Sequence, residues 1–204
     1  MNYHFPYWGP FLCRLKVEQE FVNILLEKGN ESREKKLDHR SSLAGAIDNS
    51  YYYKNYEEWF KPRLDEYLNI YIKGAKDYVN TAFKSLPDSW DLDGLWINYQ
   101  KAYEYNPPHH HSGDLSFVMY LQVPDEIREE NIQMKGVHNN LGPGMIEFDY
   151  GADLPFNISS FSYLPDVGDL FIFPAWLKHH VFAFKSDVER ISVSGNINFK
   201  YKEN

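Results

Sequence analysis

The 204-residue sequence has one cysteine, no long apolar run and no surplus of basic residues. A lone Cys13 cannot form an intramolecular disulfide, which is typical of proteins from a reducing, intracellular compartment. A membrane helix needs about 20 consecutive apolar residues, and the first residues lack the basic and apolar regions of a signal peptide. We therefore expect a cytoplasmic protein that does not enter a membrane.

Acidic residues outnumber basic ones, 29 to 21, which gives a formal net charge of −8. Because binding to a phosphate backbone needs Lys and Arg concentrated on one face, this balance argues against nucleic acid as a partner. The sequence also lacks a P-loop, a complete G-x-G-x-x-G and a G-x-S-x-G nucleophile elbow. Small molecules or proteins are the expected partners, and nothing indicates an oligomeric state.

Helical patterns are concentrated in the first half of the chain. A short strand is expected near residues 10–16, then an amphipathic helix over 17–28 that ends at Gly29, and a polar loop over 30–42. A second helical pattern runs from about residue 56 to 83 and ends before Pro87. The apolar stripe of that pattern consists of Phe60, Leu64, Leu68, Tyr71, Ala75, Val79 and Phe83.

From residue 95 onward, short β-rich runs alternate with Gly, Pro, Asn and Asp. The expected strands cover 96–105, 115–123, 145–150, 169–173, 179–184 and 190–199. This order predicts a single domain over 1–204, with a helical support region and first strands in 1–94 and a β core in 95–204. The core should be a sandwich or partly closed barrel with helices on one outer face.

Histidines are distributed unevenly, with three in a row at 109–111 and two at 179–180. Successive residues of a strand point to opposite faces, so His109 and His111 share a face and can chelate one first-row metal ion. We predict His179 as the third ligand, with His180 on the opposite face. The alternative is that the His-rich stretch is a solvated loop without a metal. The segments that follow the histidines help to decide between a metal site and such a loop.

A polar row follows on the last strand and lies on one face: Arg190, Ser192, Ser194 and Asn196. A guanidinium with a hydroxyl two residues further on suits capture of a carboxylate. The alternative is a strand at the edge of a sheet whose polar face points to solvent, because such a strand would carry the same row of polar residues. Tyr120 shares a face with Ser116 and Val118 on an earlier strand, where it could donate its phenol to the same carboxylate or serve as a core tyrosine.

The ordered set of these motifs resembles the Fe(II)/2-oxoglutarate-dependent oxygenases. The motifs are H-x-H at 109–111, S-x-x-x-Y-L at 116–121, P-x-x-G-D-L-x-x-F-P-x-x-L-x-H at 165–179 and R-x-S at 190–192. The resemblance is nearest to small oxygenases encoded by phages, a branch similar to prolyl 4-hydroxylases. It covers about half of the chain, and each motif alone is weak.

The resemblance implies a mainly β fold with N-terminal helices, namely a double-stranded β-helix of the jelly-roll, cupin-like kind. It implies an oxygenase that uses Fe(II), 2-oxoglutarate and O2 to hydroxylate a substrate, with a peptidyl residue such as proline as the natural candidate. His109 and His179 would bind the iron, Arg190 and Ser192 would anchor the distal carboxylate of 2-oxoglutarate, and Tyr120 would assist. A phage-encoded protein would act in the host cytoplasm.

One position departs from the family pattern. The usual third ligand is a carboxylate in H-x-D or H-x-E, whereas this sequence has His111 there. We predict His111 as the ligand, because Asp114 has the wrong strand parity relative to His109 and needs a bend through Ser112 and Gly113. A site of three neutral histidines is more positive than the usual one, which leaves its full activity open.

Two other functions fit parts of the same pattern. A cupin-like metal-dependent dioxygenase could use three histidines without 2-oxoglutarate, and a jelly-roll module could bind a partner without catalysis, because a fold alone does not fix a function. The Tyr-rich segments 51–53 and 99–105 could flank a groove for a peptide. The response of the metal-bound protein to 2-oxoglutarate distinguishes these functions.

Overall fold

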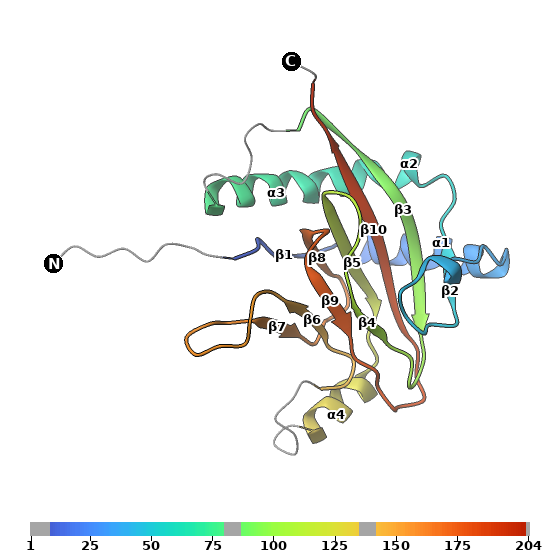
Figure 1. The fold of residues 1–204 in the computed structure, drawn as a ribbon. Coiled ribbons are helices and arrows are strands. Elements are labelled where there is room, and N and C mark those ends of the chain that lie inside the picture. The colour runs from blue at the N-terminus through green and yellow to red at the C-terminus, as the bar shows by residue number, and fades with distance from the viewer. Residues whose placement is uncertain (1–8, 80–86, 135–141, 203–204) are drawn as a thin grey trace.

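Two antiparallel sheets face each other in the computed structural model, which describes residues 9–79, 87–134 and 142–202 (Figure 1). The major sheet has the order β1-β8-β5-β10-β3-β2 and the minor sheet the order β4-β9-β6-β7. The strands of the major sheet are β1 (Cys13–Lys16), β2 (Ser50–Tyr52), β3 (Ser89–Gln100), β5 (Leu115–Gln122), β8 (Asp169–Pro174) and β10 (Arg190–Lys200). Those of the minor sheet are β4 (Asn106–His109), β6 (Ile146–Asp149), β7 (Ser160–Tyr163) and β9 (Lys178–Val181). The expected double-stranded β-helix class is confirmed.

Two long helices cover the outer face of the major sheet. These two helices are α1 (Gln19–Glu34) and α3 (Lys61–Val79). The structure also has the short helix α2 (Tyr56–Trp59), helix α4 (Asp125–Met134) and a 3-10 turn at Arg40–Ser42. The predicted apolar stripe is buried from Phe60 through Ala75 and packs against Leu95, Ile97 and Val193 of the sheet. Figure 1 shows α4 at the opposite end of the barrel from α3. Phe83 and the side chain of Val79 lie outside the described residues.

Strand alternation divides β5 and β10 between two cores. Ile191 and Val193 pack toward the helices, whereas Val118 and Tyr120 pack toward Ile146 and its neighbours in the minor sheet. Side chains of successive strand residues point to opposite faces, so each strand contributes to both cores. The inner face of the major sheet is therefore the one on which a site between the sheets can form.

The predicted end of the first helix at Gly29 is wrong, because α1 continues to Glu34. A Cβ atom at Gly29 would lie 2.4 Å from Cδ1 of Ile97. The glycine therefore serves close helix-to-sheet packing instead of ending the helix. The predicted loop over 30–42 is helical as far as Glu34 and includes a 3-10 turn at Arg40–Ser42.

Other boundaries also differ from expectation. Strand β3 begins at Ser89 and ends at Gln100, and β9 ends at Val181, so the expected strands over 96–105 and 179–184 were misplaced. Strands β2, β4 and β7 and helix α4 were not predicted. Pro107 and Pro108 lie inside β4, and proline has no N–H for a sheet, which hides such a strand from sequence reasoning.

A β-bulge interrupts the pairing of β3 with β10. Ser194 pairs with Trp96, whereas Asn196 pairs with Asp93, and the register shifts at Gly195. Gly94 takes a positive φ of 81° at this point, a conformation that favours glycine. Trp96 and Asp93 therefore lie on the same face although they are three residues apart.

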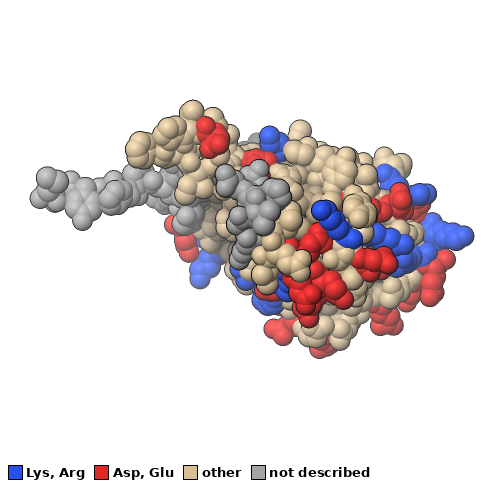
Figure 2. All heavy atoms as spheres, turned by 90° about the horizontal axis from the view of Figure 1, so that it is seen from below, with Lys and Arg blue, Asp and Glu red and all other residues tan. Residues whose placement is uncertain are grey.

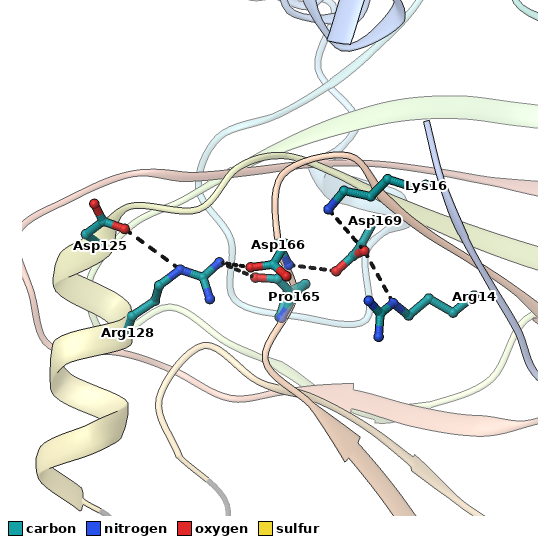
Figure 3. A network of polar contacts seen from close by, with 7 residues as sticks. All are labelled: Arg14, Lys16, Asp125, Arg128, Pro165, Asp166 and Asp169. Atoms are coloured by element: carbon teal, nitrogen blue, oxygen red, sulfur yellow. Dashed lines mark hydrogen bonds and ion pairs between the residues drawn. The ribbon is translucent and has the colours of Figure 1, made fainter. Parts of the chain in front are cut away.

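The G-D-L motif supports a buried turn at the start of β8 (Figure 3). The fully buried carboxylate of Asp169 accepts a hydrogen bond from the backbone N–H of Asp166 at 2.7 Å. Arg14 and Lys16 on β1 donate to the same carboxylate at 3.3 and 3.4 Å. Arg128 on α4 donates to the carbonyl oxygen of Pro165 at 3.0 Å. The motif thus joins β1, β8 and α4 and has a structural role.

Among the described residues, no helix combines the length and the apolar character that a membrane span requires. Figure 2 shows acidic and basic side chains intermixed on the face seen from below.

Candidate metal and co-substrate site

Three histidines converge between the sheets. The ligand atoms of His109, His111 and His179 all lie within 4.8 Å of one another. His109 on β4 pairs in register with His179 on β9, and their ring centroids are 4.3 Å apart. The backbone N–H of His111 donates to the carbonyl oxygen of Ala175 at 2.9 Å, which fixes its position after β4. These are the three histidines that the sequence predicted as one cluster.

Backbone carbonyls orient two of the three rings. Nδ1 of His109 lies 2.7 Å from the carbonyl oxygen of Pro107. Nδ1 of His179 lies 2.9 Å from the carbonyl oxygen of Leu177. Because a carbonyl oxygen only accepts, each Nδ1 carries the hydrogen and each Nε2 keeps its lone pair. Metal-binding histidines are usually oriented in this way.

Burial lowers the pKa of all three histidines. Desolvation lowers the pKa of His109, and it lowers the pKa of His111 to about 4 and that of His179 to about 3. The neighbouring imidazoles lower these pKa values further. All three rings are therefore neutral at pH 7, which is the form that binds a metal.

The other candidate ligands lie elsewhere. Asp114 accepts a hydrogen bond from the backbone N–H of Phe199 at 2.6 Å, so its carboxylate faces the end of β10. His110 is exposed. His180 points to the outer face of the minor sheet, 3.6 Å from a carboxylate oxygen of Glu147 and 3.5 Å from one of Asp149. We call Glu147, Asp149 and His180 the outer trio, a second cluster with metal-ligand spacing.

A cavity of about 260 Å³ joins the three histidines to Arg190, Tyr120 and Ser192. Arg190 is only 2% exposed, and its guanidinium carbon lies 5.3 Å from the centroid of the Tyr120 ring. It donates to the carbonyl oxygen of Gly144 at 2.7 Å and also to Oε1 of Gln100. Among the described residues, neither Nε of Arg190 nor the hydroxyl of Tyr120 has a hydrogen-bond partner.

The unpartnered atoms are informative because buried polar groups nearly always have partners. Burial raises the pKa of Tyr120 to about 12, so its hydroxyl keeps its proton and can donate. Ser192 follows Arg190 by two residues and lines the same cavity. Strand β10 lies between β3 and β5, so it is not an edge strand with a solvent-facing polar row. All four residues of that row, Arg190, Ser192, Ser194 and Asn196, line the cavity.

Sequence reasoning missed several residues that line the same cavity: His39, Asp93, Trp96, Asn98 and Asn106. It also missed Gln100, which orients Arg190. Gly94 inside a strand pattern is a sign of a bulge and could have pointed to Asp93. No feature of the sequence marks His39, which reaches the cavity from the loop before β2.

The residues present fit both groups that the family resemblance implies. Three neutral imidazoles suit a first-row divalent ion such as Fe(II), although Nε2 of His109 lies 3.4 Å from the side-chain nitrogen of Asn106 and would exchange that contact for the ion. A buried guanidinium beside a phenol and a hydroxyl suits a carboxylate, as the distal end of 2-oxoglutarate offers. The set lacks the carboxylate ligand that is usual for such iron sites.

Comparison with known proteins identifies the family. A family model described as "Putative 2OG-Fe(II) oxygenase" matches residues 94–196, half of the chain. No curated protein sequence matches.

Solved structures share the fold at low identity. A prolyl-4-hydroxylase of Pseudomonas putida superimposes with a TM-score of 0.59 at 11% identity, over 94% of this chain and 93% of its own. A viral collagen prolyl hydroxylase from Paramecium Bursaria Chlorella virus-1, solved with 2-oxoglutarate, gives 0.58 at 12% identity, over 95% and 98%. The family match and the shared double-stranded β-helix show that this chain belongs to the 2OG-Fe(II) oxygenases, oxidoreductases that use Fe(II), 2-oxoglutarate and O2.

Proposed function

We propose that His109, His111 and His179 hold the Fe(II), with His111 in the place of the usual carboxylate ligand. The observation that carries this proposal is the convergence of three neutral imidazoles beside a buried guanidinium with an unpartnered Nε. Asp114 is the alternative third ligand, and its hydrogen bond to the backbone of Phe199 argues against it. Three neutral ligands leave more positive charge at the iron than the usual set does.

Arg190, Tyr120 and Ser192 bind the distal carboxylate of 2-oxoglutarate in this proposal. Gln100 and the Gly144 carbonyl accept hydrogen bonds from the terminal nitrogens of Arg190, which orients the guanidinium. Its Nε–H is then available to the carboxylate. The Tyr120 hydroxyl, which has no other partner among the described residues, supplies a second donor.

The bound iron supplies activation of O2, by which oxidative decarboxylation of 2-oxoglutarate to succinate and CO2 is coupled to hydroxylation of a substrate. The chain orients the reactants and excludes water. Val118, Ile146 and Phe173 add apolar side chains to the cavity that the histidines and Arg190 also line. A water-poor cavity strengthens the pairing of the co-substrate with Arg190 and limits side reactions.

The substrate proposed here is a residue of a peptide. Two structural neighbours are prolyl hydroxylases, a viral collagen prolyl hydroxylase and one from Trichoplax adhaerens in complex with a hypoxia inducible factor peptide fragment. In this chain, Tyr52 lines the cavity, and Tyr103 and Tyr105 are exposed. Tyrosines combine an apolar ring with a hydroxyl, which suits a surface that contacts a peptide.

An anaerobic titration tests the site assignment. The Fe(II)-loaded protein should bind 2-oxoglutarate with a new visible absorption band, and exposure to O2 should yield succinate. Arg190→Ala should weaken 2-oxoglutarate binding about 30-fold or more, because a buried charge-assisted pair is lost, while iron is retained. Asp114→Asn is the matched control and should change neither.

Two results would contradict the assignment. Iron loss in Asp114→Asn would make that carboxylate a ligand, and unchanged 2-oxoglutarate affinity in Arg190→Ala would remove the guanidinium from its role. A protein that retains iron but never binds 2-oxoglutarate would be a three-histidine dioxygenase of another kind.

A further inference from the structure

Two charged residues of opposite sign lie far apart along the cavity. Among the described residues, Asp93 is the only acidic residue that lines it and Arg190 the only Lys or Arg. Arg190 pairs in the sheet with Gln100, and Asp93 pairs with Asn196. Seven residues separate Asp93 from Gln100 on β3, which corresponds to roughly 20 Å along a strand. Arg190 is buried, whereas Asp93 is exposed at the mouth.

The β-bulge turns Asp93 toward the cavity. With regular alternation, Asp93 would share the face of Leu95 and Ile97, which pack into the apolar core under the helices. The register shift instead pairs Asp93 with Asn196, which lines the cavity, and it turns Leu92 into the core. Bulges beside active sites commonly redirect a side chain in this way.

Asp93 has no ion-pair or hydrogen-bond partner in the described part of the chain, unlike its neighbour on the same strand. Asp91 pairs with Lys61 and Lys200. The charge of Asp93 is therefore left uncompensated at the solvent-exposed end of the cavity lining. The co-substrate would not neutralise it, because 2-oxoglutarate is itself an anion and would occupy the Arg190 end.

An aromatic wall connects the mouth to the histidine cluster. The centroid of the Trp96 ring lies 4.8 Å from the ring centroid of His39 and 6.1 Å from that of His111. Tyr52 contacts His39 edge to face at 4.0 Å. Burial lowers the pKa of His39 to about 4, so this ring adds no positive charge at pH 7. Aromatic faces beside an unpaired carboxylate attract an ammonium or guanidinium group.

We propose that Asp93 is a specificity-determining residue that selects substrates with a cationic group, a Lys or Arg side chain of a peptide, close to the residue that is hydroxylated. Asp93 binds the cation, and Trp96 and Tyr52 contact its apolar stem. The inference rests on the proposed function, since it takes Arg190 as occupied by the co-substrate.

Calorimetric titration of matched peptides tests the proposal. The full chain is loaded with Mn(II) and 2-oxoglutarate, so that binding is measured without turnover. The probes are blocked heptapeptides with a central proline and a single Lys, Gln or Glu at each flanking position in turn. In at least one position, Lys should bind about fivefold to tenfold more tightly than Gln, and Glu more weakly than Gln. The preference should decrease as salt is added.

Asp93→Asn, which keeps the shape of the side chain, should bring the Lys-to-Gln affinity ratio to about one. Asp91→Asn is the control two residues away and should leave the ratio unchanged. Equal binding of the Lys and Gln peptides at every position, including no binding of either, would overturn the proposal. A Lys preference that survives in Asp93→Asn would overturn it as well.

The same samples separate this proposal from the proposed function. If 2-oxoglutarate binds through Arg190 but no Lys preference is found, only the role of Asp93 is wrong. If a Lys preference depends on Asp93 but 2-oxoglutarate never binds, Asp93 keeps its role in cation selection and the assignment of Arg190 is wrong.

Discussion

Polar side chains on the inner and outer faces of the barrel differ in the partners they have within the protein. On the inner face, Arg190 Nε and the Tyr120 hydroxyl have no partner among the described residues. On the outer face, the side chain of Ser162 donates to Glu147 at 2.5 Å, and His180 lies within 3.6 Å of carboxylate oxygens of Glu147 and Asp149, although its Nδ1 makes no hydrogen bond among the described residues. Polar groups that pair with each other stabilise the fold, whereas buried polar groups without a protein partner are available to bind a ligand. Inner substitutions should therefore weaken ligand binding, and outer ones should lower stability.

The adjacent residues His179 and His180 give the sharpest form of this comparison. His179→Ala should lose nearly all bound iron, because the remaining two imidazoles hold the ion too weakly. His180→Ala, one residue away on the same strand, should retain it. Metal analysis of both purified variants measures the difference. Iron loss in His180→Ala alone would move the metal to the outer trio.

The second largest effect should come from Asp169, which lies outside the cavity. Asp169→Asn removes a buried carboxylate that accepts hydrogen bonds from Arg14, Lys16 and the backbone of Asp166. We expect the free energy of unfolding to fall by about 2 kcal/mol, with unchanged affinity for 2-oxoglutarate. Urea denaturation and 2-oxoglutarate titration of the same variant measure both quantities. A large loss of affinity at native stability would make the G-D-L motif part of the site.

Two tyrosines separate the effects of an inner and an outer hydroxyl. Tyr120→Phe should weaken 2-oxoglutarate binding about fivefold and leave stability unchanged, because this hydroxyl has no protein partner. Tyr53→Phe is the matched control: its hydroxyl donates to the carbonyl oxygen of Leu25 at 2.8 Å. The control should lose about 1 kcal/mol of stability without a change in affinity. The reverse pattern would contradict the comparison.

A smaller effect concerns pH. Burial lowers the pKa of His39 and His111 to about 4 and that of His179 to about 3, whereas in the unfolded chain these groups titrate near 6.5. The unfolded state therefore binds more protons below pH 6.5, and the metal-free protein should lose stability as the pH falls from 7 to 5. Above pH 7 the histidines should make no pH-dependent contribution. Urea titrations at several pH values measure the slope, and His39→Asn should make it shallower.

Strand alternation explains why much of the site could be predicted from the sequence. The polar row on β10 follows from a period of two residues and agrees with the cavity lining. His111 also lines the cavity, but it lies beyond the end of β4, and its backbone hydrogen bond to Ala175 rather than strand alternation places it there. The prediction of His179 rests on its place at the end of the segment 168–179 in the β-rich half, and the pairing of β9 with β4 brings it beside His109. The ligand roles of these residues stay predictions until a metal is bound.

The residues that escaped prediction depend on contacts between distant segments. Gly29 resembled a helix end, but its role is close packing against Ile97 of β3. Asp93 reaches the cavity only because of the bulge opposite Gly195. His39 lies in a loop whose position is set by pairing with β2, where its backbone N–H donates to the carbonyl oxygen of Ser50. Local sequence patterns carry little information about such contacts.

A crystal structure of the full chain with Mn(II) and 2-oxoglutarate, grown without O2, tests the central claim most directly. We expect one ion bound by His109, His111 and His179, and a carboxylate of 2-oxoglutarate within hydrogen-bond distance of Arg190 and Tyr120. An ion at the outer trio, Asp114 among the ligands, or a co-substrate that does not contact Arg190 would contradict the account.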